Sequence, residues 1–277
     1  MAKSSQQGAR RAGLPAQASV VDQTTHTPNR SAAVEAQVGA AGPTYRILRT
    51  NEFDAKDTPT PVAPFSAPAA PVGDDFAGEA RKSAKLVLAA APVEDLADVG
   101  ALIATLPAQT AMVRHRPRIT TAPDSGRVAE ENRNVRLRAF LYAASREADN
   151  DFHLIVGRDP NSEPHVYMTN EISGLPPEGS DSFAALKSAR DAYKTFFGDH
   201  LPGASYDFYD PPIPIEIEGS LFFDMSHARG RSPGPPSLHA DMPTIWEIHP
   251  VSKIVFEPQG CPQVVVTATR PAARSED

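Results

Sequence analysis

Seven acidic and histidine residues occur in three short clusters, each beside an apolar run, so that side chains from distant segments could meet. They are Asp149, Asp151, His153, Asp224, His227, Glu247 and His249. Carboxylate and imidazole donors without a thiolate suit a divalent ion such as magnesium, calcium, manganese or zinc. A metal ion beside paired carboxylates is the usual basis of phosphodiester hydrolysis. One hypothesis is therefore a metal-dependent hydrolase of the phosphodiesterase or nuclease type.

Each of these residues also has a structural interpretation. Asp149 and Asp151 fall in a predicted turn, which favours aspartate, and a histidine at a strand position, such as His153, is commonly hydrogen-bonded within the fold. Cys261 is the only cysteine, so an intrachain disulfide and a cysteine-based zinc site are both excluded. The second hypothesis is a non-catalytic binding module that needs no cofactor. The two hypotheses differ in whether the seven side chains converge.

The second and third clusters lie on two segments that are expected to be strands. In the stretch 213–223, isoleucines alternate with Glu216 and Glu218, which predicts a strand with one buried face. Gly219 interrupts the alternation and indicates a bulge or a bend. A proline- and glycine-rich loop separates this strand from the next, which is expected at Trp246–Ile254. That loop adds two further candidate residues, His239 and Asp241.

The order of the predicted elements indicates the fold class. Three strands, near 135–142, 152–156 and 165–169, precede a helix from Asp181 to Gly198, and the two strands described above follow it. This order is typical of the OB-fold, a five-stranded Greek-key barrel with its helix between strands three and four. An α+β sandwich with the same elements is the alternative. The helix is expected to close one end of the barrel with the following apolar side chains: Phe183, Leu186, Tyr193 and Phe197.

Three motifs carry a resemblance to a known group of sequences. They are DNDFHLIVGRD at 149–159, GSLFFDMSH at 219–227 and WEIHPVSKI at 246–254. Together they resemble an uncharacterised group of bacterial OB-like domain proteins with the motifs D-x-D-[YF]-H-L, G-x-x-F-F-D-x-x-H and E-[LI]-H-P-V in that order. The resemblance covers about 135–256 and none of the N-terminal half. It implies a fold and no established activity.

In an OB barrel, the loop joining strands one and two opens at the same end as the loop joining strands four and five, where ligands bind. Asp149 and Asp151 belong to the first loop, and Asp224 and His227 to the second. The clusters are therefore expected to converge, and the binding module is expected to recognise an unidentified ligand or partner at this loop end.

Composition divides the chain into four predicted regions. Fifteen of the nineteen aromatic residues lie between Phe140 and Phe256, so the packed core is expected in a domain at 131–258. Residues 1–80 form an Ala/Pro-rich tail that is expected to be disordered, with a short strand or docking peptide around Tyr45–Phe53 as an exception. Residues 81–130 are interpreted as an amphipathic helix and a basic linker, and 259–277 as a disordered C-terminal tail.

The amphipathic helix is expected from Pro92 to Leu106, because Val93, Leu96 and Val99 begin a helical spacing of apolar residues. By alternation, Phe222 falls on the solvent side of its strand and needs a cover. We therefore expect this helix to pack over Phe222 and to join the two halves of the chain.

Charge and motifs exclude several functional classes. The 131–258 region has 11 Lys and Arg residues against 19 Asp and Glu residues, which disfavours generic nucleic-acid binding. The basic stretch 114–127 has no interleaved aromatic residue and is interpreted as a solvated linker. No phosphate-binding glycine loop, serine-hydrolase elbow or HExxH motif is present. With neither a secretory signal nor a membrane-spanning run, a cytoplasmic location is expected.

Overall fold

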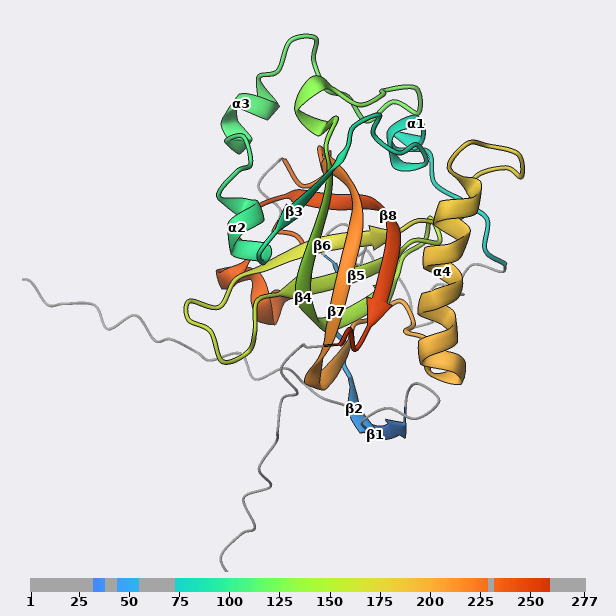
Figure 1. Ribbon diagram of the computed structural model, residues 1–277, viewed down its shortest axis with the longest axis vertical. Coiled ribbons are helices and arrows are strands. Elements are labelled where there is room, and N and C mark those ends of the chain that lie inside the picture. The colour runs from blue at the N-terminus through green and yellow to red at the C-terminus, as the bar shows by residue number, and fades with distance from the viewer. Residues whose placement is uncertain (1–31, 38–43, 55–72, 229–231, 260–277) are drawn as a thin grey trace, which may run out of the picture.

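The computed structural model describes residues 32–37, 44–54, 73–228 and 232–259. This part of the chain is mostly β-structure with few helices (Figure 1). Its strands are β1 Ala32–Gln37, β2 Thr44–Arg49, β3 Val93–Leu96, β4 Asn134–Arg146, β5 Phe152–Gly157, β6 Tyr167–Ile172, β7 Asp207–Phe223 and β8 Trp246–Phe256. Its α-helices are α1 Lys82–Lys85, α2 Val99–Ile103, α3 Gln109–Val113 and α4 Phe183–Phe197. Short 3-10 turns span Ala129–Glu131, Gly198–His200 and Pro236–Asp241.

All eight strands belong to one mixed sheet in the order β1-β2-β7-β8-β6-β5-β4-β3. β4 also pairs with β7, so hydrogen-bonded pairings run from β4 through β5, β6, β8 and β7 back to β4. β6 and β8 are parallel and share one residue pair, Asn170 with Ile248, whereas the other pairings in this circuit are antiparallel. The five strands predicted between 135 and 254 are therefore all present.

The long strand β7 has the predicted alternation. Ile213, Ile215 and Ile217 are fully buried, and the register shifts on both sides of Gly219. A Cβ at Gly219 would lie 2.4 Å from the Pro250 oxygen, so only glycine allows β8 to approach here. The predicted bulge is confirmed.

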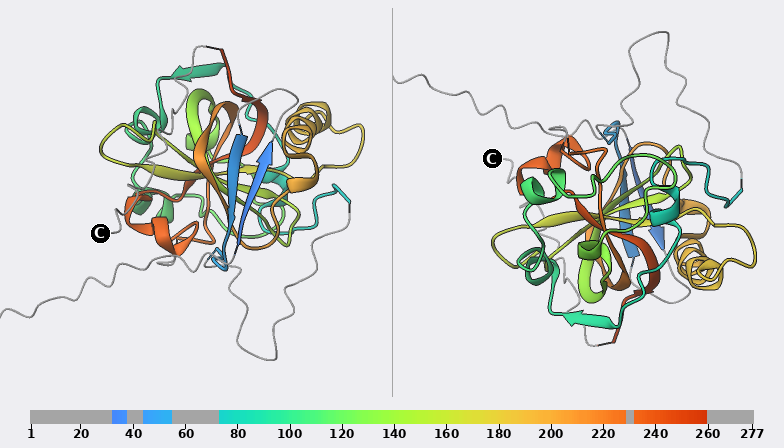
Figure 2. Two further views of the ribbon diagram at one scale, coloured as in Figure 1. Left: turned by 90° about the horizontal axis from the view of Figure 1, so that it is seen from below. Right: turned by 90° about the horizontal axis from the view of Figure 1, so that it is seen from above.

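The predicted helix is confirmed as α4, which ends at Gly198 with a positive φ of 54°. It lies against β8, outside the sheet and opposite α2 and α3 (Figure 2). Tyr193 and Phe197 join the main core, and the Phe196 ring stacks on Phe256 at 3.9 Å. Phe183 is only half-buried and does not contribute to that core.

The helix predicted at Pro92–Leu106 is wrong. Val93–Leu96 form β3, which pairs in parallel with β4, and only Val99–Ile103 are helical. Glu94 and Asp95 resemble first-turn acids in the sequence, but they make ion pairs with Arg133 and Arg136 beside the sheet edge. Asp98 caps α2 by accepting a hydrogen bond from the Ala101 amide. The helix therefore starts only after its cap at Asp98, because the preceding residues pair with β4 instead of following the helical apolar spacing.

In the N-terminal region, the short strand expected around Tyr45–Phe53 is observed as β2, which pairs with the start of β7. Tyr45 and Ile47 belong to the main core. The predicted disordered tails fall largely on 1–31, 38–43, 55–72 and 260–277, which lie outside the described residues.

Candidate metal centre

The seven candidate residues gather on one face of β5, β6 and β8. Strand alternation places Leu154, Met168 and Ile248 on the inner face, where they join the main apolar core. The opposite, outer face carries Asp151 and His153 from β5 and its approach, Thr169 and Glu171 from β6, and Glu247 and His249 from β8. These outer-face side chains are as buried as the apolar ones.

Three segments cover the outer face. The segment carrying α1 contributes Lys85, the segment after β2 contributes Asp54, and the loop after β7 contributes Asp224 and His227. Arg127 fixes the first cover, because its guanidinium donates hydrogen bonds to the Ala84 and His249 carbonyls at 2.9 and 2.6 Å. The face is therefore sealed by parts of the chain that are distant in sequence.

Arg81 also belongs to this cover. Its guanidinium donates to both Glu131 oxygens, at 2.7 and 2.8 Å, and to the Phe223 carbonyl at 3.0 Å. The same group stacks over the Phe222 ring at 4.6 Å. Phe222 is 1% exposed, so the prediction that it needs a cover is confirmed. Arg81, and not the predicted Pro92–Leu106 helix, provides that contact.

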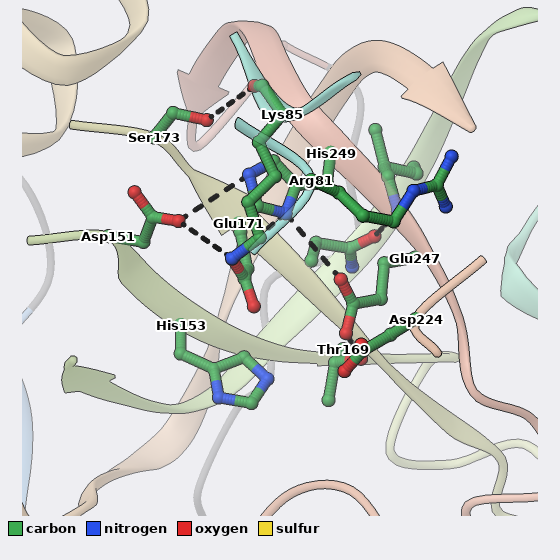
Figure 3. A network of polar contacts seen from close by, with 12 residues as sticks. Arg81, Lys85, Asp151, His153, Thr169, Glu171, Ser173, Asp224, Glu247 and His249 are labelled. Atoms are coloured by element: carbon green, nitrogen blue, oxygen red, sulfur yellow. Dashed lines mark hydrogen bonds and ion pairs between the residues drawn. The ribbon is translucent and has the colours of Figure 1, made fainter. Parts of the chain in front are cut away.

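The first half of the centre surrounds the Lys85 ammonium group. Lys85 Nζ lies 3.0 Å from Asp149, 3.4 Å from Asp151 and 3.4 Å from Glu171. His249 contacts two of these acids, with Nε2 3.5 Å from Asp151 and Nδ1 2.9 Å from Glu171 (Figure 3). One ammonium and one imidazole are thus shared among three carboxylates.

Burial and neighbouring charges shift the pKa values here. Burial, and then the charge of Asp149, raise the pKa of Asp151 well above its usual value, although Lys85 and His249 act in the opposite direction. Burial, the largest single cause, lowers the pKa of His249, but the charge of Glu171 and the hydrogen bonds to Glu171 and Glu247 together outweigh it, and the pKa rises to about 9. The electrostatic environment therefore favours a positive charge at this position.

The second half of the centre surrounds His153 and His227. His153 Nδ1 lies 2.8 Å from Glu147, 3.0 Å from the Tyr206 hydroxyl and 3.8 Å from Asp54. His227 lies between two acids, with Nδ1 bonded to Asp224 and Nε2 2.9 Å from Asp54. The pKa of His153 is raised to about 9 and that of His227 to about 10, because these carboxylates outweigh the effect of burial.

Glu247 connects the two halves. Its carboxylate accepts a hydrogen bond from the Thr169 hydroxyl at 3.1 Å and lies 3.6 Å from His249. Four sets of three residues each bring one ligand atom per residue within 4.8 Å of one another, and Glu247 belongs to two of them. The four sets are Asp54–Glu147–His153, Asp151–Glu171–His249, His153–Glu171–Glu247 and Asp224–His227–Glu247. The centre is continuous across the outer face.

The charge balance of the centre favours a cation. Six buried carboxylates contribute to it, and the half-buried Asp149 is a seventh; the six are Asp54, Glu147, Asp151, Glu171, Asp224 and Glu247. In the described part of the chain, the positive groups in contact with these acids are Lys85 and the three imidazoles. Within the described part of the chain, the carboxylates outnumber these positive groups, and the raised pKa of Asp151 allows a proton to neutralise one of the acids.

His153 supplies an independent observation. Its Nε2 atom is fully buried and has no hydrogen-bond partner among the described residues. Nearly all buried polar atoms in folded proteins are hydrogen-bonded, and imidazole nitrogen is a common metal ligand. Nδ1 faces Glu147, and one ring nitrogen of His153 lies within 4.8 Å of an oxygen of both Glu171 and Glu247. This is the arrangement expected of a ligand that holds a metal ion.

Some of the acids also have structural roles. Asp151 accepts a hydrogen bond from the Gly174 amide at 2.7 Å, Asp224 one from the Ser226 amide at 2.7 Å, and Asp54 one from the Gly234 amide at 2.7 Å. Each of these acids uses one oxygen for the backbone and directs the other toward the centre. These three acids therefore have a structural role in the loops and also converge with the other side chains of the centre.

All seven residues predicted from the sequence lie in or beside the centre, but the two loop candidates do not. His239 Nε2 contacts the Gly234 carbonyl at 2.9 Å, and Asp241 is exposed. Four contributors were not predicted: Asp54, Lys85, Glu147 and Glu171. Of these, Glu171 lies just beyond the strand predicted near 165–169, and no pattern in the sequence singled out the other three.

No protein family, curated protein or solved structure matches this chain. The assignment of function therefore depends on the geometry and chemistry of the centre. Among the described residues, no helix is long and apolar enough to cross a bilayer.

One cavity lies next to the centre. It has a volume of about 740 Å³ and is lined by Ala80, Arg118, Ile119, Thr120, Thr121, Met225 and Ser226. Met225 and Ser226 directly follow Asp224, which is 5% exposed. The cavity thus adjoins the end of the centre that contains Asp224 and His227.

Proposed function

We propose that this protein is an OB-like binding domain whose covered outer face holds a divalent cation. The pairing circuit β4-β5-β6-β8-β7, with α4 between the third and fourth of these strands, supports an OB-like architecture. The β4–β5 and β7–β8 loops both contribute to the centre, through Glu147 and Asp149 and through Asp224 and His227. The ligand of the binding domain is accordingly expected at this loop end.

The observation that carries the proposal is the convergence of buried carboxylates around His153, whose Nε2 atom has no hydrogen-bond partner among the described residues. The set His153, Glu171 and Glu247 lies at the middle of the centre, where both halves meet. A divalent cation here would balance two carboxylates and provide a partner for His153 Nε2. Mixed imidazole and carboxylate donors favour manganese or zinc over calcium, which prefers oxygen ligands alone.

A thermal-shift screen of the EDTA-treated protein tests this proposal. A cation that binds only the folded state raises stability by about 2.7 kcal/mol at 100 times its Kd, which corresponds to roughly 5–10 °C for a domain of this size. We expect Mn²⁺ or Zn²⁺ to produce this shift in the wild type and in His165→Ala, which changes an exposed histidine outside the centre. Glu171→Gln should abolish the shift, and an equal shift in both variants would contradict the proposal.

The cavity beside Asp224 favours a second candidate function, metal-dependent hydrolysis of a phosphodiester. A metal ion in the set Asp224–His227–Glu247 would lie at the end of the centre nearest the cavity. The ion would supply Lewis-acid polarisation of a phosphoryl oxygen, while the buried carboxylates hold it in place. Release of nitrophenol from bis(p-nitrophenyl) phosphate with Mn²⁺, lost in Asp224→Asn, would support this function. No turnover by the metal-loaded wild type would reject it.

A further inference from the structure

The cavity next to Asp224 has a lining unlike the rest of the domain. Around it are one arginine, Arg118, three hydroxyl side chains and three apolar residues, and no carboxylate is among the described residues that line it. The region 131–258 carries 19 acidic residues against 11 basic ones. The cavity lies where the basic stretch 114–127 meets this acidic region.

Arg118 is available to a ligand. It is exposed, and no hydrogen bond or ion pair to another residue is found for it in the described part of the chain. Nearby Arg116, in contrast, donates to the Arg114 and His115 carbonyls at 3.3 and 3.1 Å. Arg133 and Arg136, which also lie at the surface, pair with acids. Arg118 thus lines the cavity with a guanidinium for which no protein partner is found among the described residues.

The segment that carries Arg118 is anchored. Ile119 is 2% exposed and packs in the main core, which fixes the backbone between Arg118 and Thr120. The Thr120 hydroxyl accepts a hydrogen bond from the Ala122 amide at 3.3 Å, so its own hydrogen can be donated to a ligand. On the opposite wall, the Ser226 amide is bonded to Asp224. Both walls are therefore held in place before a ligand arrives.

We propose that this cavity binds the phosphate group of a small phosphorylated molecule. A guanidinium provides charge-assisted donors in a fork that matches phosphate oxygens, and Thr120, Thr121 and Ser226 add hydroxyl donors around it. Hydroxyls from two walls suit a tetrahedral anion with several acceptors better than a planar carboxylate. The volume of about 740 Å³ lies within the usual range for small-molecule sites, so the phosphate belongs to a larger molecule.

This inference names the ligand class for the proposed binding function but does not depend on the metal centre. The cavity residues Arg118, Thr120 and Ser226 are not among the four candidate metal-binding sets. Phosphate binding by EDTA-treated protein therefore tests the cavity alone, and the thermal shift with Mn²⁺ or Zn²⁺ tests the centre alone. If one proposal fails its experiment, the other experiment can still be interpreted.

Isothermal titration of the full chain with phenyl phosphate, in EDTA and at constant ionic strength, tests the inference. We expect saturable binding that weakens about tenfold or more in Arg118→Ala. Arg118→Lys should keep part of the affinity, and Ser226→Ala should reduce it. Arg116→Ala is the matched control. It also removes one arginine charge, only two residues from Arg118, but the Arg116 side chain does not line the cavity.

Three results would overturn the inference. The first is no saturable binding of phenyl phosphate by the wild-type protein. The second is an equal loss of affinity in Arg118→Ala and Arg116→Ala, which would indicate general attraction of an anion to the basic loop. Binding of benzoate as tight as that of phenyl phosphate would also contradict it, since the hydroxyls would then not select a tetrahedral anion.

Discussion

The two faces of β5, β6 and β8 are equally buried but chemically opposite. On the inner face, Leu154, Met168 and Ile248 are each 0% exposed; on the outer face, so are His153, Glu171 and His249. Burial of the inner face is favourable by about 25 cal/mol per Å² of apolar surface. Burial of the outer face is unfavourable unless each charge is compensated. Burial by itself therefore does not distinguish an apolar core from a functional site. The chemical nature of the buried side chains does.

The largest effect is expected on the outer face, from Lys85→Met. This change removes the ammonium group that lies between Asp149, Asp151 and Glu171 and keeps most of the side-chain volume. Breaking a buried charge pair on one side costs about 3–5 kcal/mol, measured as the free energy of unfolding in urea. A divalent cation should restore part of this loss. A loss below about 1 kcal/mol would mean that the carboxylates do not need Lys85.

On the inner face, Leu154→Ala should cost about 2–5 kcal/mol, because the side chain is fully buried in the apolar core. In contrast with Lys85→Met, no cation should restore the stability. Val87→Ala, at a site 53% exposed, is the control and should change the free energy of unfolding by less than about 0.5 kcal/mol. Rescue of Leu154→Ala by metal would show that metal acts on the whole fold and not on the outer face.

A smaller, pH-dependent effect is expected at Asp207, a buried carboxylate outside the centre. Burial raises its pKa to about 6, although Arg49, 3.9 Å away, acts in the opposite direction. Between about pH 4 and pH 6 the folded protein retains a proton that the unfolded chain has lost, so its stability falls as the pH rises through this window. Two pKa units correspond to at most about 3 kcal/mol.

Replacing Asp207 with Asn should remove this contribution. The variant should gain stability relative to wild type as the pH rises from about 4 to 7, measured by urea unfolding at each pH. The test uses the difference in the free energy of unfolding between the two proteins at each pH, because the histidines of the centre titrate in both. If the difference in the free energy of unfolding stays constant across this pH range, burial does not raise the pKa of Asp207.

Local patterns were sufficient to predict the five strands and the long helix between 135 and 256. The alternation in β7, the bulge at Gly219 and the apolar face of α4 with its stop at Gly198 all depend on residues close in sequence. The helix at Pro92–Leu106 was wrong because β3 is stabilised by pairing with β4, about 40 residues later. Apolar spacing in a short segment could not reveal that distant partner.

The candidate site was also predictable only as far as local patterns in the sequence reach. Strand alternation indicated which residues share a face, and this brought together His153, Asp224, Glu247 and their neighbours. It did not indicate that the face is covered, because the covers come from Asp54 and Lys85, far away in sequence. Glu247 and His249 alternate with the apolar residues of β8 as on a solvated face, whereas the structure buries both of them.

Crystals of the protein soaked in Mn²⁺ and measured for anomalous scattering test the central claim most directly. The account predicts a peak in the centre, about 2.0–2.3 Å from His153 Nε2 and from carboxylate oxygens of Glu171 and Glu247. The peak should be absent from crystals of Glu171→Gln grown and soaked in the same way. A wild-type map with no peak on this face, or with manganese only at exposed acids, would contradict the claim that the buried carboxylates and His153 form a metal site.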